Sequence, residues 1–318
     1  MANMTLSKNG NSGVISLGRA EVEPESPWRI ALRRYLKHRM AVFGTVLLGL
    51  VLLFVLIGPL FFTEDYANKT KILDKFKPPS AVHPFGTDQV GRDILARVIY
   101  GGQISIAIAV VAVVISIIVG TVVGLLAGYF GGWVDGMLMR LVEALLSIPP
   151  LFLLLMLSNS LSRSTATVTI LGRELSVTVV VIVMIIGLTS WMALSRIVRA
   201  LVLSLKEQEF VVAAQSIGAR DGLIIRAHIL PNVVAPVIVS ATLGVGGAII
   251  TEAYLSFLGF GVLPPTATWG NILTRAQDQL DKVWWMWMAP GFFIVVTVLA
   301  INFIGDGLRD AFDPRSTK

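Results

Sequence analysis

The sequence contains few side chains that could carry out bond chemistry. It has 318 residues, no cysteine and only three histidines, so it offers no thiolate nucleophile, no disulfide framework and no thiolate metal site. Neither a Gly-x-Ser-x-Gly motif nor a His-Glu-x-x-His motif occurs, and no histidine falls within an apolar segment. These absences argue against a hydrolytic active site within the chain.

Two polar residues are candidates for binding rather than for catalysis. Glu252 lies in an apolar segment, where a carboxylate is costly and is by default a functional candidate. It could bind the amino terminus of a substrate, or it could form structural hydrogen bonds, which its place near the end of the segment favours. His83 could ligate a metal, but it has no spaced partner, so we expect a hydrogen-bonding turn residue.

The stretch 206–232, KEQEFVVAAQSIGARDGLIIRAHILPN, is the longest polar interruption in the apolar second half of the chain. Apolar residues recur at helical spacing between 207 and 217 and predict a short helix of about 16 Å. Gly218 suits the left-handed backbone that follows a helix, and Asp221 can cap the next segment. Physical reasoning alone leaves two alternatives open: an amphipathic helix on the membrane surface, or a docking element.

The composition is that of a membrane protein. Apolar residues make up 55% of the chain and charged residues only 14%, and the mean hydropathy is +0.77. The net charge of +6 is modest, and no basic and aromatic residues interleave along a polar face, so we expect no nucleic-acid partner. The first apolar stretch follows a polar tail and lacks a small-residue cleavage pattern, which predicts an uncleaved signal anchor.

Charge-free windows near the ~20 residues that cross a membrane predict six transmembrane helices in an all-α protein. These windows are 40–62, 101–130, 144–162, 175–195, 229–251 and 283–305. They divide the chain into an N-terminal tail with a basic amphipathic segment (1–39), a first transmembrane helix (40–62), an extracytoplasmic loop (63–100), a transmembrane core (101–308) and a C-terminal tail (309–318). With both termini in the cytoplasm, 16 of the 26 Lys and Arg residues lie inside, as the positive-inside rule requires.

Three features of these windows predict details of the bundle. Ser116 and three glycines at four-residue steps, Gly120, Gly124 and Gly128, predict close helix packing within the bundle. The pair 149–150, Pro-Pro, must break or kink the third helix, either as a hinge, as a pathway lining or as simple packing. The segment LPPTATWGNIL and the tryptophans at 284, 285 and 287 predict an outer interface belt.

The stretch 206–232 resembles the EAA loop of ABC-importer permeases, which fits into a cleft of the ATPase subunit. The matching residues are the alanine pair 213–214, Gly218 and the Ile-Leu-Pro at 229–231. One position departs from the pattern, because the acidic residue that usually precedes the two alanines is Val212 here. The resemblance transfers the acidic role to Glu209.

Other strings resemble the dipeptide and oligopeptide branch of that family. They are HPFGTDQVGRD at 83–93, HILPN at 228–232 and NFIGDGLRDAFDPR at 302–315. The resemblance covers nearly all of 28–315 and points to the C-type subunit of a peptide importer.

Membership of this family implies a type I ABC-importer permease bundle in a bacterial or archaeal cytoplasmic (inner) membrane. It implies a heterodimer with a B-type permease, two cytoplasmic ATPase subunits that hold ATP and Mg, an extracytoplasmic binding protein and a peptide substrate. This chain would bind no cofactor and catalyse no reaction, since it lacks a Gly-x-x-x-x-Gly-Lys-Ser/Thr loop.

The resemblance assigns ATPase coupling to the loop 206–230, called the coupling loop from here on. Its predicted coupling residues are Glu209, Phe210, Ala213, Ala214, Ile217, Gly218, Ala219 and Arg220. The candidates for the pathway or for gating are Pro149, Pro150 and Glu252. Import of nickel, glutathione or another small solute stays open, as does an ion-gradient-driven secondary transporter, although only Glu252 offers an ionisable group at depth.

Overall fold

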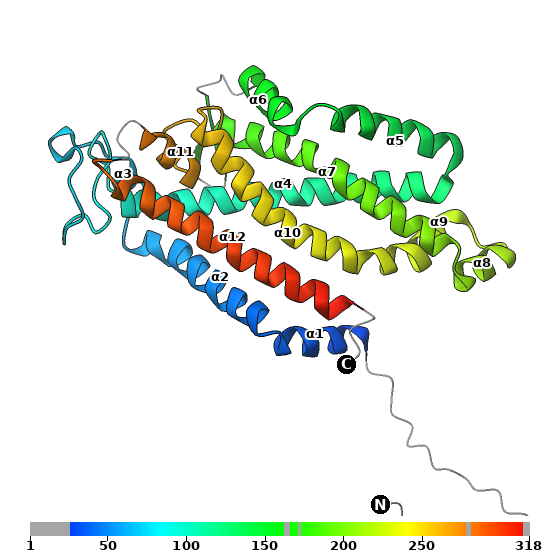
Figure 1. Ribbon diagram of the computed structural model, residues 1–318. Helices are drawn as coiled ribbons and strands as arrows, with labels where there is room; N and C mark the ends of the chain where they lie inside the picture. Colours follow the sequence, from blue (N-terminus) through cyan, green and yellow to red (C-terminus); the bar gives the residue numbers. More distant parts are fainter. Residues whose placement is uncertain (1–25, 162–165, 171–172, 278–280, 314–318) are drawn as a thin grey trace, which may run out of the picture.

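The computed structural model is an elongated bundle of helices (Figure 1) and describes residues 26–161, 166–170, 173–277 and 281–313. Five described helices are long and apolar enough to cross a membrane, and there are six spans if one bent pair counts as a single span. The prediction of a multi-helix membrane protein is therefore confirmed, with the third predicted span as the point of difference. Most of the tail 1–39 and the last residues of 309–318 lie outside the described residues.

The long helices run along the bundle, and short elements join them. The long helices are α2 (Arg39–Ile57), α4 (Ile94–Phe130), α7 (Val177–Lys206), α10 (Leu230–Phe257) and α12 (Trp285–Phe312). The short α-helices are α1 (Pro27–Lys37), α3 (Glu64–Asn68), α5 (Gly132–Leu146), α6 (Pro150–Leu161), α8 (Glu209–Ser216), α9 (Asp221–Ile224) and α11 (Trp269–Thr274). The remaining elements are the 3-10 turns η1 (Gly58–Leu60) and η2 (Ile72–Asp74), the π-helical turn η3 (Ile225–Ile229) and the strands β1 (Thr167–Ile170) and β2 (Arg173–Ser176).

Helices α4 and α7 pack closely because glycines face the contact. A Cβ at Gly124 would lie 2.7 Å from the carbonyl oxygen of Ser195 and 2.6 Å from the Cβ of Val198. Gly120 and Gly128 meet α7 in the same way, one turn to either side. The predicted packing of this small-residue face within the bundle is confirmed.

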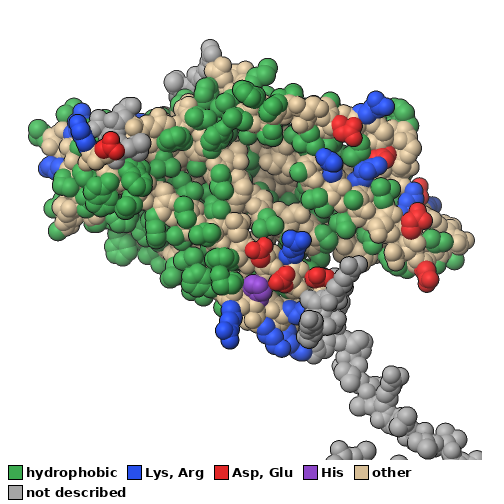
Figure 2. All heavy atoms as spheres, viewed as in Figure 1, with side chains coloured by type: hydrophobic (Ala, Val, Ile, Leu, Met, Phe, Trp, Pro, Cys, Tyr) green, Lys and Arg blue, Asp and Glu red, His purple; other side chains and the backbone are tan. Residues whose placement is uncertain are grey.

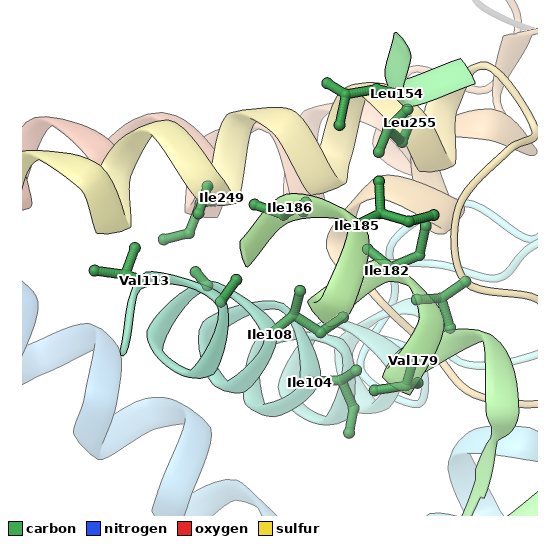
Figure 3. Close-up of a cluster of buried hydrophobic side chains, with 14 of the residues drawn as sticks. Ile104, Ile108, Val113, Leu154, Val179, Ile182, Ile185, Ile186, Ile249 and Leu255 are labelled. Carbon is green, nitrogen blue, oxygen red and sulfur yellow. The ribbon is translucent and has the colours of Figure 1, made fainter. Parts of the chain in front are cut away.

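The largest apolar cluster lies where α10 joins α4 and α7 (Figure 3). Ile108 of α4, Ile182 and Ile186 of α7, and Ile249 of α10 are all buried in it. β-Branched side chains fill this space with few rotamers to lose. The cluster makes these three helices the centre of the bundle.

The third predicted span is not one straight helix. Instead of a helix over 144–162, α5 and α6 meet at an angle of 83° on either side of Pro149. Proline cannot donate the backbone hydrogen bond that would continue the helix. The predicted break at 149–150 is confirmed, and it is sharp enough to form two separate helices.

Other helix limits extend past the charge-free windows. α4 begins at Ile94, where the Asp93 carboxylate accepts a hydrogen bond from the N–H of Ala96 at 2.9 Å. α7 continues to Lys206, eleven residues beyond the predicted window 175–195. A charge-free window ends, by definition, at the first charged residue. A helix can continue past that residue where the charged side chain reaches water.

A β-hairpin interrupts the otherwise helical chain. β1 and β2 pair antiparallel, with Thr167 opposite Ser176, in the connection between α6 and α7. The all-α prediction missed it because four-residue strands are too short for a reliable period in the sequence.

The two ends of the bundle differ in what they carry (Figure 1). The end that carries α8, here the α8 end, also holds α1 and the last turn of α12. The ring centroids of Trp28 and Phe312 are 5.4 Å apart, and Arg34 donates to the carbonyl oxygen of Asp313. The opposite end, here the α11 end, holds α11, the β-hairpin and the loop that begins at α3. The two described ends of the chain therefore lie at the same end of the bundle.

Candidate functional site

The coupling loop folds as two helical pieces around a left-handed turn. α8 occupies 209–216, within the predicted helix, and Gly218 has φ +78°, as predicted. The predicted capping role of Asp221 is wrong, because Arg220 takes the N-cap position of α9. The carboxylate of Asp221 instead accepts a hydrogen bond from the hydroxyl of Tyr129 at 2.7 Å.

α8 has one buried face and one exposed face. Val211 and Ala214 are buried in an apolar cluster with side chains of α4, α7 and α10, among them Leu125 and Val202. On the other side Ile217 is 86% exposed. The loop is thus attached to the bundle along one face and presents the other.

Most of the predicted coupling residues belong to the exposed face. Six are exposed: Glu209, Phe210, Ala213, Ile217, Gly218 and Arg220. Ala219 is half-buried, and the side chain of Ala214 packs against helices of this chain. The sequence could not separate the two alanines, because neighbouring small residues carry no signal of which one faces inward.

The exposed face has the chemistry of a docking surface rather than of a reactive site. It combines small side chains, which let another backbone approach, with exposed apolar ones such as Phe210 and Ile217. Figure 2 shows Lys, Arg, Asp and Glu side chains gathered at both ends of the molecule, whereas hydrophobic side chains cover much of the surface between them. Exposed apolar patches with a polar rim are typical of protein contact sites.

Polar side chains at the α8 end also form hydrogen bonds between helices of this chain. Arg199 of α7 donates two hydrogen bonds of 2.5 Å to the carboxylate of Asp135 on α5. Lys206 donates to the carbonyl oxygen of Tyr129 at 2.8 Å. These contacts could not be predicted from the sequence, since the partners are more than 60 residues apart and no motif marks them.

At the α11 end, Glu252 lies fully buried within a polar cluster. Its two oxygens accept hydrogen bonds from Ser105 at 2.9 Å and Ser256 at 2.8 Å. Each serine oxygen in turn accepts a backbone N–H, from Trp269 and from Val262. The carboxylate therefore links α4, α10 and the segment around α11, and both of its oxygens are occupied by protein donors.

Trp269 differs from its predicted place in an interface belt. It is fully buried, and its indole Nε1 donates to the carbonyl oxygen of Val98 at 2.9 Å. Trp285 is also buried, whereas Trp284 and Trp287 are exposed as predicted. Burial of the first two follows from contacts with α4 and with the loop before it, which hydropathy does not record.

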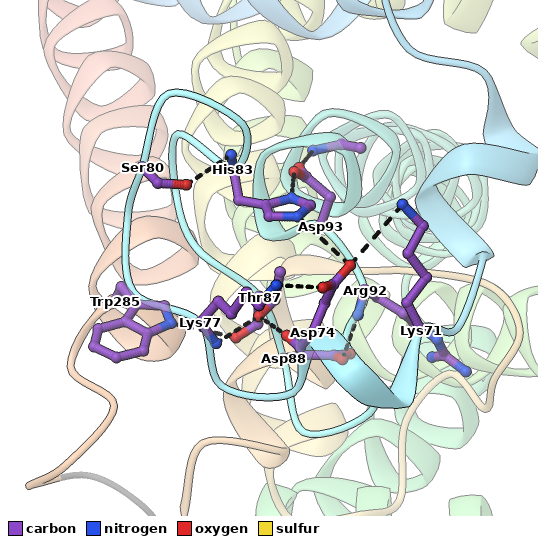
Figure 4. Close-up of polar contacts among 11 residues, drawn as sticks. Lys71, Asp74, Lys77, Ser80, His83, Thr87, Asp88, Arg92, Asp93 and Trp285 are labelled. Atoms are coloured by element: carbon purple, nitrogen blue, oxygen red, sulfur yellow. Dashed lines mark hydrogen bonds and ion pairs between the residues drawn. The ribbon is translucent and has the colours of Figure 1, made fainter.

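His83 is a hydrogen-bonding residue in the loop before α4, as predicted (Figure 4). Its Nδ1 lies 2.8 Å from an Asp93 oxygen, and the other oxygen of Asp93 caps α4. On the same loop the hydrogen bond from Lys77 to Asp74, 2.5 Å long, holds the pKa of Asp74 below its usual range. No cluster of three potential metal ligands occurs in the part of the chain that the structure describes.

Comparison with known proteins gives matches along most of the chain. Residues 120–318 match the family described as binding-protein-dependent transport system inner membrane component, and residues 26–79 match the N-terminal transmembrane domain of oligopeptide transport permease C. The chain is 42% identical over 302 residues to a Brucella suis protein named as a peptide permease, covering 94% of this chain and 95% of the relative.

Two further relatives are similar over almost the same length. The oligopeptide transport system permease protein OppC of Salmonella typhimurium is 40% identical over 318 residues, covering 98% of this chain and 99% of the relative. OppC of Bacillus subtilis is 37% identical over 293 residues, covering 92% and 91%.

Proposed function

The chain belongs to the family of binding-protein-dependent transport system inner membrane components, and we propose that it forms half of the translocation pathway of an ATP-driven peptide importer. It is a multi-pass inner membrane permease subunit of the ABC importers and not an enzyme. Its proposed partners are a B-type permease, two cytoplasmic ATPase subunits that hold ATP and Mg, and an extracytoplasmic binding protein that delivers the peptide. The names of the relatives support peptides as the substrate class.

The exposed face of α8 is the observation that carries this proposal. Val211 and Ala214 hold one side of the helix in the bundle, while Phe210, Ala213 and Ile217 face outward. A partner that binds this face therefore contacts a helix that packs on α4, α7 and α10, through which its movement can reach the bundle. Transport then follows as a population shift, because ATP binding to the partner must favour one conformation of the pair of permeases over the other.

The distribution of charge supports a cytoplasmic location for the α8 end. Basic residues are frequent beside it, with Arg33, Arg34 and Lys37 on α1 and Arg196 and Arg199 on the last turns of α7. Lys and Arg near span ends favour the cytoplasmic side. The ATPase subunits would therefore reach α8, and the α11 end would face the binding protein.

Two other features have proposed roles in alternating access. The 83° bend at Pro149 and Pro150 is a proposed hinge, because both prolines are exposed and the backbone there has no continuous helix to resist rotation. Glu252 is proposed to hold the α11 end together, since both of its oxygens already accept hydrogen bonds from serines.

Cross-linking tests the coupling role directly. The chain has no native cysteine, so Ala213→Cys and Ile217→Cys each introduce a single thiol on the exposed face. In membranes that also contain the ATPase subunits, both variants should cross-link to the ATPase, and the yield should change with ATP. The matched control is Leu73→Cys, which is as exposed but lies at the α11 end. Equal yields from the control, or uptake that continues without ATP, would overturn the proposal.

Competition tests the substrate class. In vesicles with the full assembly and its binding protein, labelled tripeptide uptake should be inhibited by unlabelled di- and tripeptides and not by Ni²⁺ or glutathione. Inhibition by Ni²⁺ or glutathione alone would assign the chain to another branch of the family. Uptake that stops on collapsing the ion gradient at constant ATP would instead indicate a secondary transporter.

A further inference from the structure

Tyr129, the penultimate residue of α4, contacts the coupling loop at two points. Lys206, the first residue of the loop, donates to the Tyr129 carbonyl oxygen at 2.8 Å, and its Nζ lies 5.7 Å from the centre of the tyrosine ring. The hydroxyl of Tyr129 donates to Asp221, the first residue of α9, at 2.7 Å. The same residue therefore meets the chain on both sides of α8.

The ring of Tyr129 also supports α8 from beneath. It is buried in the apolar cluster that contains Val211 and Ala214, the two residues that attach α8 to the bundle. Among the described residues, every side-chain hydrogen bond between the coupling loop and α4 or α5 involves Tyr129.

The corner between α4 and α5 directly follows Tyr129. α4 ends at Phe130, and Gly131 has φ +65°, with no atom within 4 Å of the position where a Cβ would be. α5 then begins, and Asp135 on its first turn is paired with Arg199 of α7. The corner therefore has free space around Gly131. Contacts of Tyr129 precede it in the chain, and the ion pair of Asp135 follows it.

We propose that Tyr129 is a positioning residue that passes the displacement of the coupling loop to the corner between α4 and α5. This inference rests on the proposed function, because it takes the coupling loop as the site where the ATPase acts. A docked partner displaces α8, and the contacts of Asp221 and Lys206 carry Tyr129 and the end of α4 along with it. Without the hydroxyl group, the link to Asp221 is lost, and the start of α9 can move relative to the end of α4 while the loop stays docked.

The test is Tyr129→Phe in proteoliposomes that hold the full assembly, with the binding protein and labelled tri-alanine outside. The variant keeps the ring and its packing and removes only the hydroxyl group. The ATPase subunits should still co-purify, and the number of peptides imported per ATP hydrolysed should fall about fivefold or more, the lower range of measured coupling between sites.

Tyr100→Phe is the matched control on the same helix. It removes a hydroxyl group that donates to the carbonyl oxygen of Phe62 at 2.8 Å, at the α11 end. Its ratio of peptide to ATP should equal that of the unmodified protein. An equal fall in both variants would overturn the proposal, as would an unchanged ratio in Tyr129→Phe.

Changes at Asp221 keep the proposal testable if Tyr129→Phe assembles poorly. Asp221 is exposed, so Asp221→Ala should assemble normally and lower the ratio as much as Tyr129→Phe, and the double variant should lower it no further. Asp221→Asn keeps a hydrogen-bond acceptor and should stay near the unmodified ratio. Additive effects in the double variant would overturn the link. Failure of the proposed function is recognised separately, because the unmodified protein would then import the peptide without ATP.

Discussion

The α8 end and the α11 end carry similar polar residues in opposite surroundings. At the α8 end, Glu209 and Arg220 are exposed beside an exposed Ile217. At the α11 end, Glu252 and Asn271 are buried, and protein groups meet their hydrogen-bonding requirements. The residue types alone therefore do not reveal a role. A polar group that already has its partners cross-links the fold, and an exposed group remains available for a second protein.

Two apolar residues, one at each end, show the same contrast. Trp269 is fully buried at the α11 end, while Ile217 is almost fully exposed at the α8 end. Burying such a side chain stabilises a protein by about 1.5–3 kcal/mol, so an exposed isoleucine contributes nothing to the isolated chain. Its contribution can come only from a surface that covers it, either a partner protein or the membrane. We expect changes at the α11 end to affect stability first, and changes at the α8 end to affect coupling first.

The largest loss of stability is expected from Trp269→Ala. The change empties a fully buried site and removes the hydrogen bond to Val98, so the free energy of unfolding should fall by about 3–5 kcal/mol. Reversible unfolding in mixed SDS micelles measures it. Trp284→Ala is the control, because that side chain is 48% exposed, and it should change stability by less than about 1 kcal/mol. Equal losses would contradict the inference that the buried side chains at the α11 end are the ones that stabilise the fold.

A smaller loss is expected from Glu252→Gln. Ser105 and Ser256 both donate to the carboxylate, and an amide can accept from only one of them, so about 1–3 kcal/mol should be lost. Peptide uptake per folded molecule should be unchanged. Glu174→Gln, at an exposed carboxylate of β2 at the same end, should alter neither quantity. If uptake disappears while stability is intact, Glu252 belongs to the transport pathway.

The sequence could predict the parts of this contrast that depend on neighbouring residues, and not those that depend on residues far apart in the chain. The coupling loop could be predicted, because the helical spacing over 207–217 and the turn at Gly218 depend on neighbouring residues. The small-residue face of α4 could be predicted as well, since the three glycines recur on one side of a helix. Both signals lie within a few turns of the chain.

The buried cluster at the α11 end could not be predicted in the same way. Trp269 is fixed by groups more than 160 residues away, Ser105 and Val98, and hydropathy places a tryptophan after a proline-rich turn at an interface. The inward side of Ala214 and the link from Tyr129 to Asp221, 92 residues apart, also depend on how helices meet. Local patterns record which segments are helical, and only the packed bundle decides which side chains are covered.

Gly218→Leu should separate an effect on stability from an effect on coupling at a single residue. A left-handed backbone costs a residue with a Cβ about 1–2 kcal/mol, and no neighbouring atom lies within 4 Å to add a clash. Membrane insertion should therefore be normal, while the altered turn misplaces α8 and abolishes ATP-driven uptake. Gly222→Leu introduces the same side chain four residues later on an ordinary helical backbone with equal space, and should keep uptake. Normal uptake by Gly218→Leu would count against the coupling role of this turn.

Ile217→Asp should have the smallest effect on stability and still prevent function. The side chain is 86% exposed, so its replacement should change the free energy of unfolding by no more than about 0.5 kcal/mol. A carboxylate at the centre of a docking surface would be desolvated without a partner, so co-purification of the ATPase subunits and ATP-driven uptake should both be lost. Ile72→Asp makes the same change at a residue that is 79% exposed at the α11 end, and the ATPase should stay bound. If both variants keep the ATPase, Ile217 does not contact the ATPase, as Ile72 does not. The two ends would then differ only in how their residues affect stability.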